Sequence, residues 1–480
     1  MKRTLLRAIA LALVLLLAFS SVGFAYEKDE VKRVSCSVYG DGATGRGFCW
    51  FTEGKTNADL DLIESARFTG SFDGAKAYAG ETTRYRSQYS HQVAVTDLQP
   101  GTAYTYRVGD RAAGVWSEAC TFVTDDRDDT LSFITIADVQ AGSLEDFTHA
   151  AETLAGAVET LPGAEFIVNL GDYVNDNTND EWDWYFEAFK AYNDAYTGVP
   201  VAGNHDGNIT NKLNTFCFRN TFCLDKTDNR SLEGVYYSFD WGNAHFAVLN
   251  TNDMYPMSQA QKNWLRNDMN ASAATWKILL MHRSLYSAGK NINKPDTIVM
   301  RDVLLPIIDE LKIDVVLSGH DHMYLRTDFL KDDARVGVSY VTEAFGGEET
   351  TFAVDPDGTV YALPSTAGTK RYAVNEDAIA PILEVAEVAE TTRDRGGCFA
   401  TVEIEGGRLV YKAYLVDDDT REITEIDRFA IKKTASGTPG GRTRDQSFFS
   451  SVYSSGVNFI VAIVKMLVSY LKLLAQVVAK

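Results

Sequence analysis

Basic residues are scarce in this chain of 480 residues. Lys and Arg together number 46 against 66 Asp and Glu, so the formal net charge at pH 7 is -20. This acidity disfavours a polyanionic partner such as nucleic acid, because the whole chain repels phosphate-rich polymers at long range. Salt screens that repulsion within roughly 10 Å, so a small anion drawn by a local positive charge is still a compatible ligand.

Acidic residues are absent from the first 25 positions, which carry three basic residues. An apolar run from Ala8 to Phe19 follows them, and Gly23-Phe24-Ala25 supplies small residues before Tyr26. This order predicts a signal peptide at residues 1–25 and an exported protein, secreted or held at the cell surface. No cysteine lies near the predicted cleavage point, so a bacterial lipoprotein anchor is not expected.

Cysteine is scarce as well, with six residues, although disulfides are permitted in an exported chain. Cys217 and Cys223 bracket a short aromatic loop, where a local bridge and two thiols are equally compatible with the sequence. The other four are Cys36, Cys49, Cys120 and Cys398. The connectivity among them is left open by the sequence.

The apolar segment near the end of the chain is interrupted by charge. Residues 434–446 have the composition of a flexible linker, and polar residues recur at helical spacing in residues 447–480. A spanning helix needs roughly 20 mostly uncharged residues, whereas Lys465 lies in the middle of this segment. We therefore expect an amphipathic C-terminal helix that contacts a membrane peripherally or mediates self-association, with burial against the protein's own surface as the alternative.

Histidine is rare too, yet four of the seven histidines lie in short clusters rich in Gly, Asp and Asn. The clusters are Gly171-Asp172, Gly203-Asn204-His205-Asp206, His282 and Gly319-His320-Asp321-His322. Imidazole, carboxylate and amide oxygen are ligands of zinc, iron and manganese. Each cluster alone is typical of a turn, but together they indicate a metal site. The remaining histidines, His91, His149 and His245, are expected to be structural.

Each cluster follows a short apolar run of the kind that forms a strand buried on both faces. The runs are Leu131 to Ala137, Glu165 to Leu170, Pro200 to Ala202, Trp276 to Met281 and Asp314 to Ser318. Helical patterns between them, such as Leu144 to Leu161 and Ile298 to Leu311, predict an α/β fold with a mainly parallel sheet. Since parallel strands share a carboxyl edge, Asp138 and the clustered residues are expected to meet there.

The clusters resemble, in order, the five motif blocks of the metallophosphoesterase superfamily, and within it those of the purple acid phosphatases. The blocks are Asp138-Val139-Gln140, Gly171-Asp172-Tyr173-Val174-Asn175, Gly203-Asn204-His205-Asp206, Leu280-Met281-His282 and Gly319-His320-Asp321-His322. Two positions depart from the family pattern. Gln140 replaces a glycine, and Asn175 replaces the tyrosine that binds ferric iron in the purple enzymes, so no purple colour is expected.

The resemblance implies a metallophosphoesterase sandwich at residues 128–433, with two central mixed sheets flanked by helices. It also implies two metal ions bridged by Asp172. The first would be held by Asp138, Asp172 and His322, and the second by Asp172, Asn204, His282 and His320. Gln140 or Asn175 can complete the set of ligands around the first ion, directly or through water. Loss of the phenolate favours a divalent ion over ferric iron there, and the choice among Fe, Zn and Mn is left open.

Residues 26–127 show alternating strand patterns and turn signals. The stretch from Leu98 through Pro100-Gly101-Thr102 to Tyr104 resembles the corner of a fibronectin type III domain, which its tyrosine ties together. A similar all-β domain precedes the catalytic domain in plant-type purple acid phosphatases, so we expect a buttress with no chemistry of its own.

Beyond the last cluster, three apolar stretches are expected to complete the catalytic sandwich. They are Val336 to Phe345, Phe399 to Leu415 and Ile423 to Ile431. The intervening stretch from Asn375 to Arg395 is acidic and helix-prone, and we expect it to be either a surface insertion or a lid.

The resemblance implies a metal-dependent hydrolase that acts on small phosphomonoesters. Two metal ions roughly 3.5 to 4 Å apart can lower the pKa of a shared water, so that hydroxide attacks the phosphoryl group. His205 is expected to contact the phosphoryl oxygens or to protonate the leaving alkoxide, with Asp206 holding its tautomer. A packed loop histidine is the structural alternative.

Two other functions are compatible with the same residues. One is a phosphodiesterase or nucleotide pyrophosphatase, because the metals set the reaction while loops set the leaving group. The other is a non-catalytic cell-surface binding protein, in which the changes at Gln140 and Asn175 have abolished hydrolysis.

Overall fold

The computed structural model describes residues 30–207, 216–225, 235–253, 257–375, 386–390 and 395–434. The predicted signal peptide and C-terminal helix lie outside these residues, as does the predicted linker apart from Thr434. Within the described part of the chain, no helix combines the length and apolar character needed to cross a bilayer.

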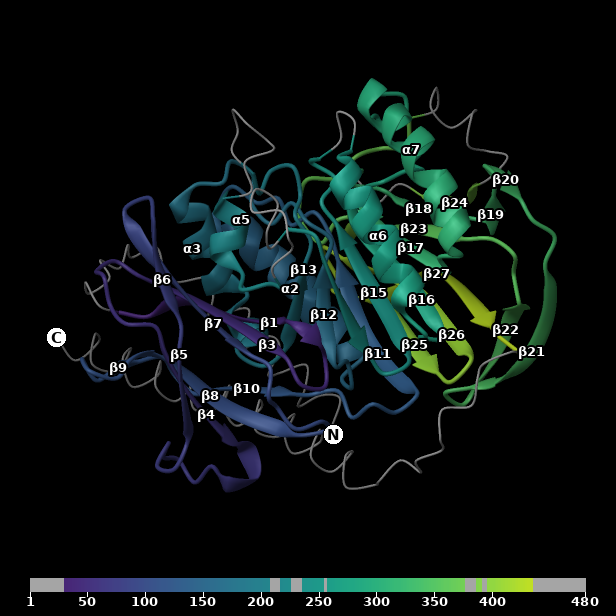
Figure 1. The fold of residues 1–480 in the computed structure, drawn as a ribbon. Helices are drawn as coiled ribbons and strands as arrows, with labels where there is room; N and C mark the ends of the chain where they lie inside the picture. The colour runs from purple at the N-terminus through teal and green to yellow at the C-terminus, as the bar shows by residue number, and fades with distance from the viewer. Residues whose placement is uncertain are drawn as a thin grey trace.

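Two large sheets form the centre of the molecule (Figure 1). The first has twelve strands. In spatial order they are β21 (Ser339–Phe345), β22 (Glu348–Val354), β27 (Ile423–Lys432), β26 (Arg408–Asp417), β25 (Gly396–Glu405), β11 (Thr130–Ile136), β12 (Phe166–Asn169), β13 (Thr197–Pro200), β1 (Lys32–Val38), β3 (Arg46–Thr52), β7 (Gln88–Val95) and β6 (Glu81–Tyr85). The strands β11, β12 and β13 pair in parallel and are fully or largely buried, as their apolar sequences predict.

The second sheet has eight strands, in the order β2 (Gly40–Asp41), β14 (Tyr237–Trp241), β15 (Ala244–Leu249), β16 (Trp276–Arg283), β17 (Val315–Gly319), β23 (Val360–Pro364), β18 (Tyr324–Thr327) and β24 (Ala386–Glu390). Its inner face packs on the first sheet through aromatic rings. Phe246 meets Phe133 and Phe166 edge-on, with ring centroids 5.6 and 5.7 Å apart. Alternate residues of β16 face opposite ways, so Ile278 and Leu280 join this core while the residues between them face the helices.

Helices cover the outer faces of both sheets. The helices α2 (Leu144–Thr160) and α3 (Asn179–Ala188) contact the twelve-stranded sheet, and α6 (Gln259–Ala271) and α7 (Pro295–Leu311) bury apolar residues against the eight-stranded sheet. Their starts follow local capping rules. The Ser143 side chain accepts a hydrogen bond from the Asp146 amide, and Thr178 and Glu181 form a capping box. The predicted α/β sandwich with two mixed sheets is confirmed.

The N-terminal all-β domain divides most of its strands between two sheets. Four of them, β1, β3, β7 and β6, lie in the twelve-stranded sheet described above. Its second sheet is β10 (Cys120–Val123), β8 (Ala103–Asp110), β4 (Asp59–Glu64) and β5 (Lys76–Ala79), with β9 (Val115–Trp116) beside β8. The Tyr104 hydroxyl accepts a hydrogen bond from the Gln99 amide at 3.0 Å, which ties the expected corner. Because β1 pairs in parallel with β13, the first sheet runs without interruption from this domain into the α/β domain that follows it.

Arg46 lies buried at that junction and bonds both sides of it. Its guanidinium donates to the carbonyls of Gly42, Gly45 and Val123 and, at 3.1 Å, to the hydroxyl of Thr197, the first residue of β13. Its guanidinium carbon also lies 4.8 Å from the centroid of the Trp241 ring of the second sheet.

The remaining short elements are η1 (Ser65–Arg67), α4 (Lys190–Asn193), α5 (Phe216–Thr221), β19 (Leu330–Lys331) and β20 (Ala334–Arg335).

One expectation changes, and one open alternative is decided. Part of the helix-prone stretch, Ala386–Glu390, is the strand β24, because the edge of β18 offers it a row of backbone partners. All six cysteines are buried thiols, so the bridge between Cys217 and Cys223 is absent. Cys217 instead donates to the Asn177 side chain and accepts from the Tyr85 hydroxyl.

Candidate metal centre

The predicted ligands come from the ends of strands in both sheets. Asp138 follows β11, Asp172 follows β12 and Asn204 follows β13 in the first sheet. In the second, His282 is the last residue but one of β16 and His320 follows β17. The sequence predicted one shared sheet edge. The structure instead brings the carboxyl ends of two packed sheets together, so the side chains converge from opposite sides.

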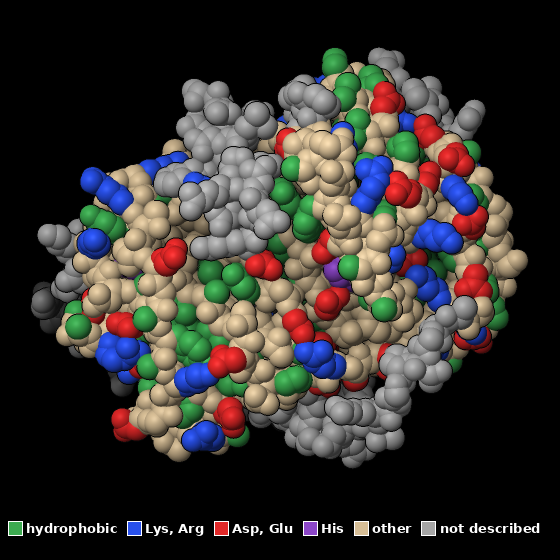
Figure 2. Space-filling view, viewed as in Figure 1, with side chains coloured by type: hydrophobic (Ala, Val, Ile, Leu, Met, Phe, Trp, Pro, Cys, Tyr) green, Lys and Arg blue, Asp and Glu red, His purple; other side chains and the backbone are tan. Residues whose placement is uncertain are grey.

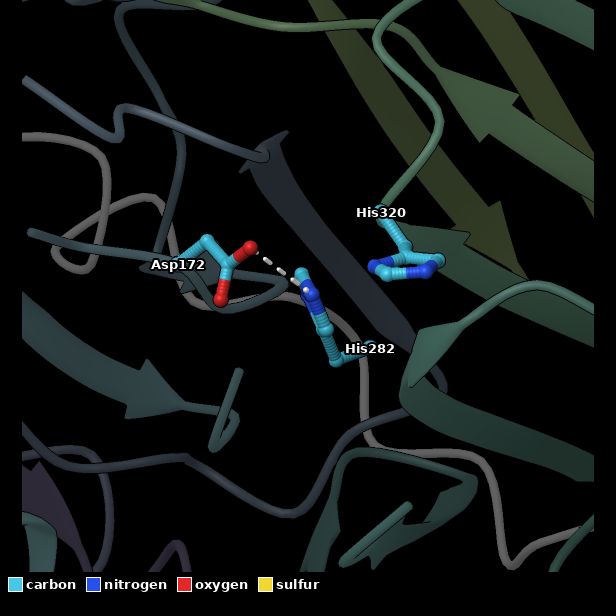
Figure 3. Close-up of side chains that lie close together, drawn as sticks. All are labelled: Asp172, His282 and His320. Atoms are coloured by element: carbon cyan, nitrogen blue, oxygen red, sulfur yellow. Dashed lines mark ion pairs between the residues drawn. The ribbon is translucent and has the colours of Figure 1, made fainter. Parts of the chain in front are cut away.

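Asp172, His282 and His320 form the centre of this convergence (Figure 3). One ligand-type atom from each lies within 4.8 Å of the others. His282 Nε2 is 3.1 Å from Asp172 Oδ2 and 3.3 Å from Asn204 Oδ1. His282 Nδ1 donates to the Leu170 carbonyl at 2.8 Å. That bond orients the ring and leaves Nε2 directed at the other ligand-type atoms, which is the usual arrangement of a metal-binding histidine.

Asp138 and His322 form a second group of ligands, which adjoins His320. His322 Nε2 is 3.4 Å from Asp138 Oδ1, and the His320 amide donates to both Asp138 oxygens at 2.9 and 3.0 Å. His322 Nδ1 donates to the Lys370 carbonyl, so its Nε2 faces the carboxylate. Six predicted ligands are thus arranged as two adjoining groups.

The backbone at these positions is strained. Asp138, Asp172 and His320 have φ values of +52°, +54° and +77°, in the left-handed region that residues with a Cβ rarely adopt. Such strain, of order 1 to 3 kcal/mol a residue, typically occurs at functional sites. Gly203 allows the close approach of two loops, because a Cβ there would lie 2.0 Å from the Asp172 amide nitrogen.

Burial and neighbouring charges set the protonation of the histidines. Burial raises the pKa of Asp172, but His282 outweighs it and holds that pKa below its usual range. Burial lowers the pKa of His282, yet Asp172 raises it to about 9. Burial, with His282 and Arg283, keeps the pKa of His320 well below its ordinary value. A cation held by His282 Nε2 would therefore replace a proton, and its binding would release that proton.

His205 is held by a different partner from the one expected. Its amide donates to Asp172 Oδ1 at 2.7 Å, and its Nδ1 donates to the Asn175 carbonyl at 2.5 Å. The prediction that Asp206 holds this tautomer is wrong. The buried Asp206 carboxylate instead accepts from the amides of Asp172, Tyr173 and Gly203 at 2.8 to 2.9 Å, so it fixes the loops that carry the ligands.

Gln140 and Asn175 lie beside the group of ligands that contains Asp138 and His322. Gln140 Nε2 is 3.5 Å from Asn175 Oδ1, while the buried Gln140 Oε1 has no hydrogen-bond partner among the described parts of the chain. Tyr173 points away, into an aromatic cluster with Trp182, Tyr185 and Phe222. Imidazole nitrogens, carboxylates, an amide and an orphaned amide oxygen suit borderline divalent metals, so the residues present fit the implied ions.

A segment not singled out from the sequence borders the centre. After β23, the Thr366 hydroxyl donates to the Asp138 carbonyl, and the Tyr372 ring stacks on His322 with centroids 4.4 Å apart. On β16, Arg283 Nη1 lies 3.2 Å from His320 Nε2. The strand β23 was detectable as an apolar run, but its contact with the ligands depends on its place in the sheet.

The other three histidines have structural partners. His91 bonds the hydroxyls of Thr52 and Thr82, and His149 lies beside Arg371. His245 bridges two carboxylates on β14 and α6.

Two family models match the chain. Residues 131–324 match the calcineurin-like phosphoesterase model, and residues 31–124 match the purple acid phosphatase N-terminal domain model. These matches agree with the resemblance carried by the five motif blocks.

Plant purple acid phosphatases are among the curated relatives of this chain. Purple acid phosphatase 23 of Arabidopsis thaliana is 23% identical over 57% of this chain and 66% of its own length. The Fe(3+)-Zn(2+) purple acid phosphatase 12 of the same plant is 24% identical over 55% of this chain and 58% of its own length. The chain therefore spans about three fifths to two thirds of the length of these relatives.

Solved structures share the fold. A purple acid phosphatase from yellow lupin (Lupinus luteus) seeds superposes with a TM-score of 0.68, at 14% identity, over 87% of this chain and 78% of that one. PhoD superposes with a TM-score of 0.61, at 13% identity, over 92% of this chain and the whole of that one.

Proposed function

Because the chain carries a calcineurin-like phosphoesterase domain behind a purple acid phosphatase N-terminal domain, we propose that it hydrolyses small phosphomonoesters at a centre of two metal ions. The observation that carries the proposal is the group formed by Asp172, His282 and His320, with Asp138 and His322 adjoining it. When bound, two such ions lower the pKa of a water and neutralise a phosphoryl group. The chain's own residues supply the rest.

Asp172 is the bridging ligand in this proposal. Its Oδ2 faces His282, whereas its Oδ1 accepts the His205 amide, so its carboxylate is held from two sides. Asp138 and His322 would hold one ion with Asp172, and Asn204, His282 and His320 the other. Gln140 Oε1 is available to the ion held by Asp138 and His322, because none of the residues that the structure describes bonds it.

His205 acts on the substrate. Its Nδ1 donates to the Asn175 carbonyl, so when the ring carries a second proton, on Nε2, that nitrogen can donate a hydrogen bond to a phosphoryl oxygen or pass its proton to the leaving oxygen. Asp206 is a positioning residue that acts through the backbone of Asp172.

The charge of the metal ions follows from the ligands around Asp138 and His322. One relative's name specifies Fe(3+) and Zn(2+), but Asn175 supplies no phenolate here. We therefore expect divalent ions at both positions, and a colourless protein.

Metal analysis together with turnover tests the proposal. The purified protein is assayed for metal per chain and for hydrolysis of a nitrophenyl phosphate and of the corresponding diester, before and after chelation. Asp172→Asn should lose metal and activity together, while Asp302→Asn, which changes an exposed carboxylate on α7 in the same way, should keep both. Full activity in the metal-free protein or in Asp172→Asn rules out the proposal, and faster turnover of the diester favours a phosphodiesterase.

Export is part of the proposal. It rests on the composition of residues 1–25, and fractionation of an expressing culture tests it. The processed protein should appear outside the cytoplasm, and removal of residues 2–25 should retain it inside.

A further inference from the structure

Residues 365–375 form a segment along one side of the metal centre. Next to Thr366, the Ala367 amide donates to the Ala137 carbonyl, and the Lys370 carbonyl accepts from His322 Nδ1. The Tyr372 amide donates to the His322 carbonyl at 3.0 Å, and the Asn375 amide to the Ala288 carbonyl at 2.9 Å. Backbone bonds therefore fix the position of this segment relative to the ligands.

The side chain of Lys370 is held close to the site by this anchoring. Its Nζ lies 3.4 Å from Asn175 Oδ1, a long hydrogen bond to a neutral amide. The ammonium is partly buried and feels the charges of Asp172 and Asp138. Among the residues that the structure describes, none forms an ion pair with it within 4.0 Å.

Asn175 connects Lys370 to the residue proposed to act on the substrate. Its carbonyl accepts from His205 Nδ1, and its side-chain oxygen accepts from Lys370. The imidazole and the ammonium thus contact opposite ends of one residue, three positions after the bridging Asp172.

A second ammonium lies nearby. Lys290 Nζ is 3.8 Å from the centroid of the Tyr372 ring, which stacks on His322. Burial and, to a smaller extent, repulsion by Lys290 lower the pKa of Lys370. The face in Figure 2 shows basic side chains interspersed with acidic ones.

Cations in the centre change the balance around Lys370. Metal ions held by Asp172 and Asp138 would neutralise two of the three carboxylates whose attraction otherwise offsets the cost of burying the ammonium, the third being Asp176. An anion then becomes the better partner, because hydrogen bonds between charged groups are stronger than one to a neutral amide.

We propose that Lys370 binds the phosphoryl group of the substrate and makes the site selective for dianionic phosphomonoesters over monoanionic phosphodiesters. The inference rests on the proposed function. A monoester at neutral pH presents two negative charges and three terminal oxygens. A diester presents one charge and has a second ester group where the ammonium would bind, so it gains less from Lys370.

The test compares Lys370→Gln, Lys370→Arg and the control Lys331→Gln, which changes an exposed lysine on β19. Each variant is loaded with metal, and kcat/KM is measured on the nitrophenyl monoester and diester. Lys370→Gln should lose about 10-fold on the monoester and at most about 3-fold on the diester. Lys370→Arg should recover most of the loss, and metal content should not change.

Inorganic phosphate serves as a second probe. Calorimetric titration of the metal-loaded proteins should show phosphate binding weakened about 10-fold in Lys370→Gln and unchanged in Lys331→Gln. Equal losses on both esters, unchanged phosphate affinity, or a loss of metal in Lys370→Gln overturns the inference. If the wild-type protein hydrolyses neither ester, the proposed function fails, and the phosphate titration still decides whether Lys370 binds the anion.

Discussion

A single methyl group at Gly203 should disable the metal centre. The loop after β13 passes so close to the loop after β12 that a Cβ at Gly203 would lie 2.0 Å from the Asp172 amide nitrogen and 2.2 Å from Asp172 Oδ1. Ordinary contacts begin at 3.4 Å. The two loops must therefore separate by about 1.4 Å, the difference between 3.4 and 2.0 Å.

The separation has two costs. Overpacking of a buried contact typically destabilises a protein by about 1 to 3 kcal/mol. It also moves Asp172, the proposed bridge, and displacing a reacting group by about 1 Å lowers turnover about 100-fold. The Asp206 carboxylate, which bonds the amides of both loops, cannot hold them at their present distances once they move.

Gly203→Ala is compared with Gly163→Ala, since a Cβ at Gly163 meets nothing within 4 Å. The assays are metal content per chain, turnover of the nitrophenyl monoester and the free energy of unfolding in denaturant. We expect Gly203→Ala to lose metal and at least about 100-fold in turnover, while Gly163→Ala matches the wild type. A Gly203→Ala protein that keeps its metal and its turnover would refute the close approach of the loops.

Three further predictions concern other parts of the molecule. His205→Gln should keep its metal and lose about 100- to 10,000-fold in turnover of alkyl phosphates, with a smaller loss on nitrophenyl phosphate, whose leaving group needs no proton; equal losses would contradict proton donation. Arg46→Met should lower the free energy of unfolding by about 3 to 5 kcal/mol, because it leaves buried carbonyls unpaired, and denaturant titration against the wild type measures it. Burial lowers the pKa of His245, but hydrogen bonds with Asp240 and Asp268 raise it to about 9, above its unfolded value. The contribution of His245 to the free energy of unfolding, about 2 to 3 kcal/mol, should therefore be complete below about pH 6.5 and lost as the pH rises through 9. An equal pH dependence of stability in His245→Gln would disprove it.

The strands that carry the site could be predicted because each is short, apolar and bounded by polar residues. The run from Leu131 to Ala137 differs from β11 by one residue at each end, and the predicted helix from Leu144 is α2. The ligand types could be predicted as well, since a Gly-His-Asp-His block after a buried strand has few structural explanations. The tied corner at Tyr104 followed from a local motif in the same way.

Contacts between distant segments could not be predicted. No sequence pattern indicates that Asp206 bonds three backbone amides, so its neighbour His205 was predicted to be its partner. Lys370 lies 195 positions after Asn175 in a stretch with no motif. The pairing of β1 with β13 joins segments 161 residues apart at Ser37 and Gly198, and strand order is decided by burial of whole sheets rather than by either strand's sequence.

The local sequence determines which residues form strands, which cap helices and which side chains can bind a metal, because periodicity and residue type act over a few neighbours. The distances between those side chains, the carbonyl that orients His205 and the ammonium beside Asn175 depend on how two sheets pack face to face. That packing is set by the burial of some hundreds of residues at once, which no short stretch of chain encodes.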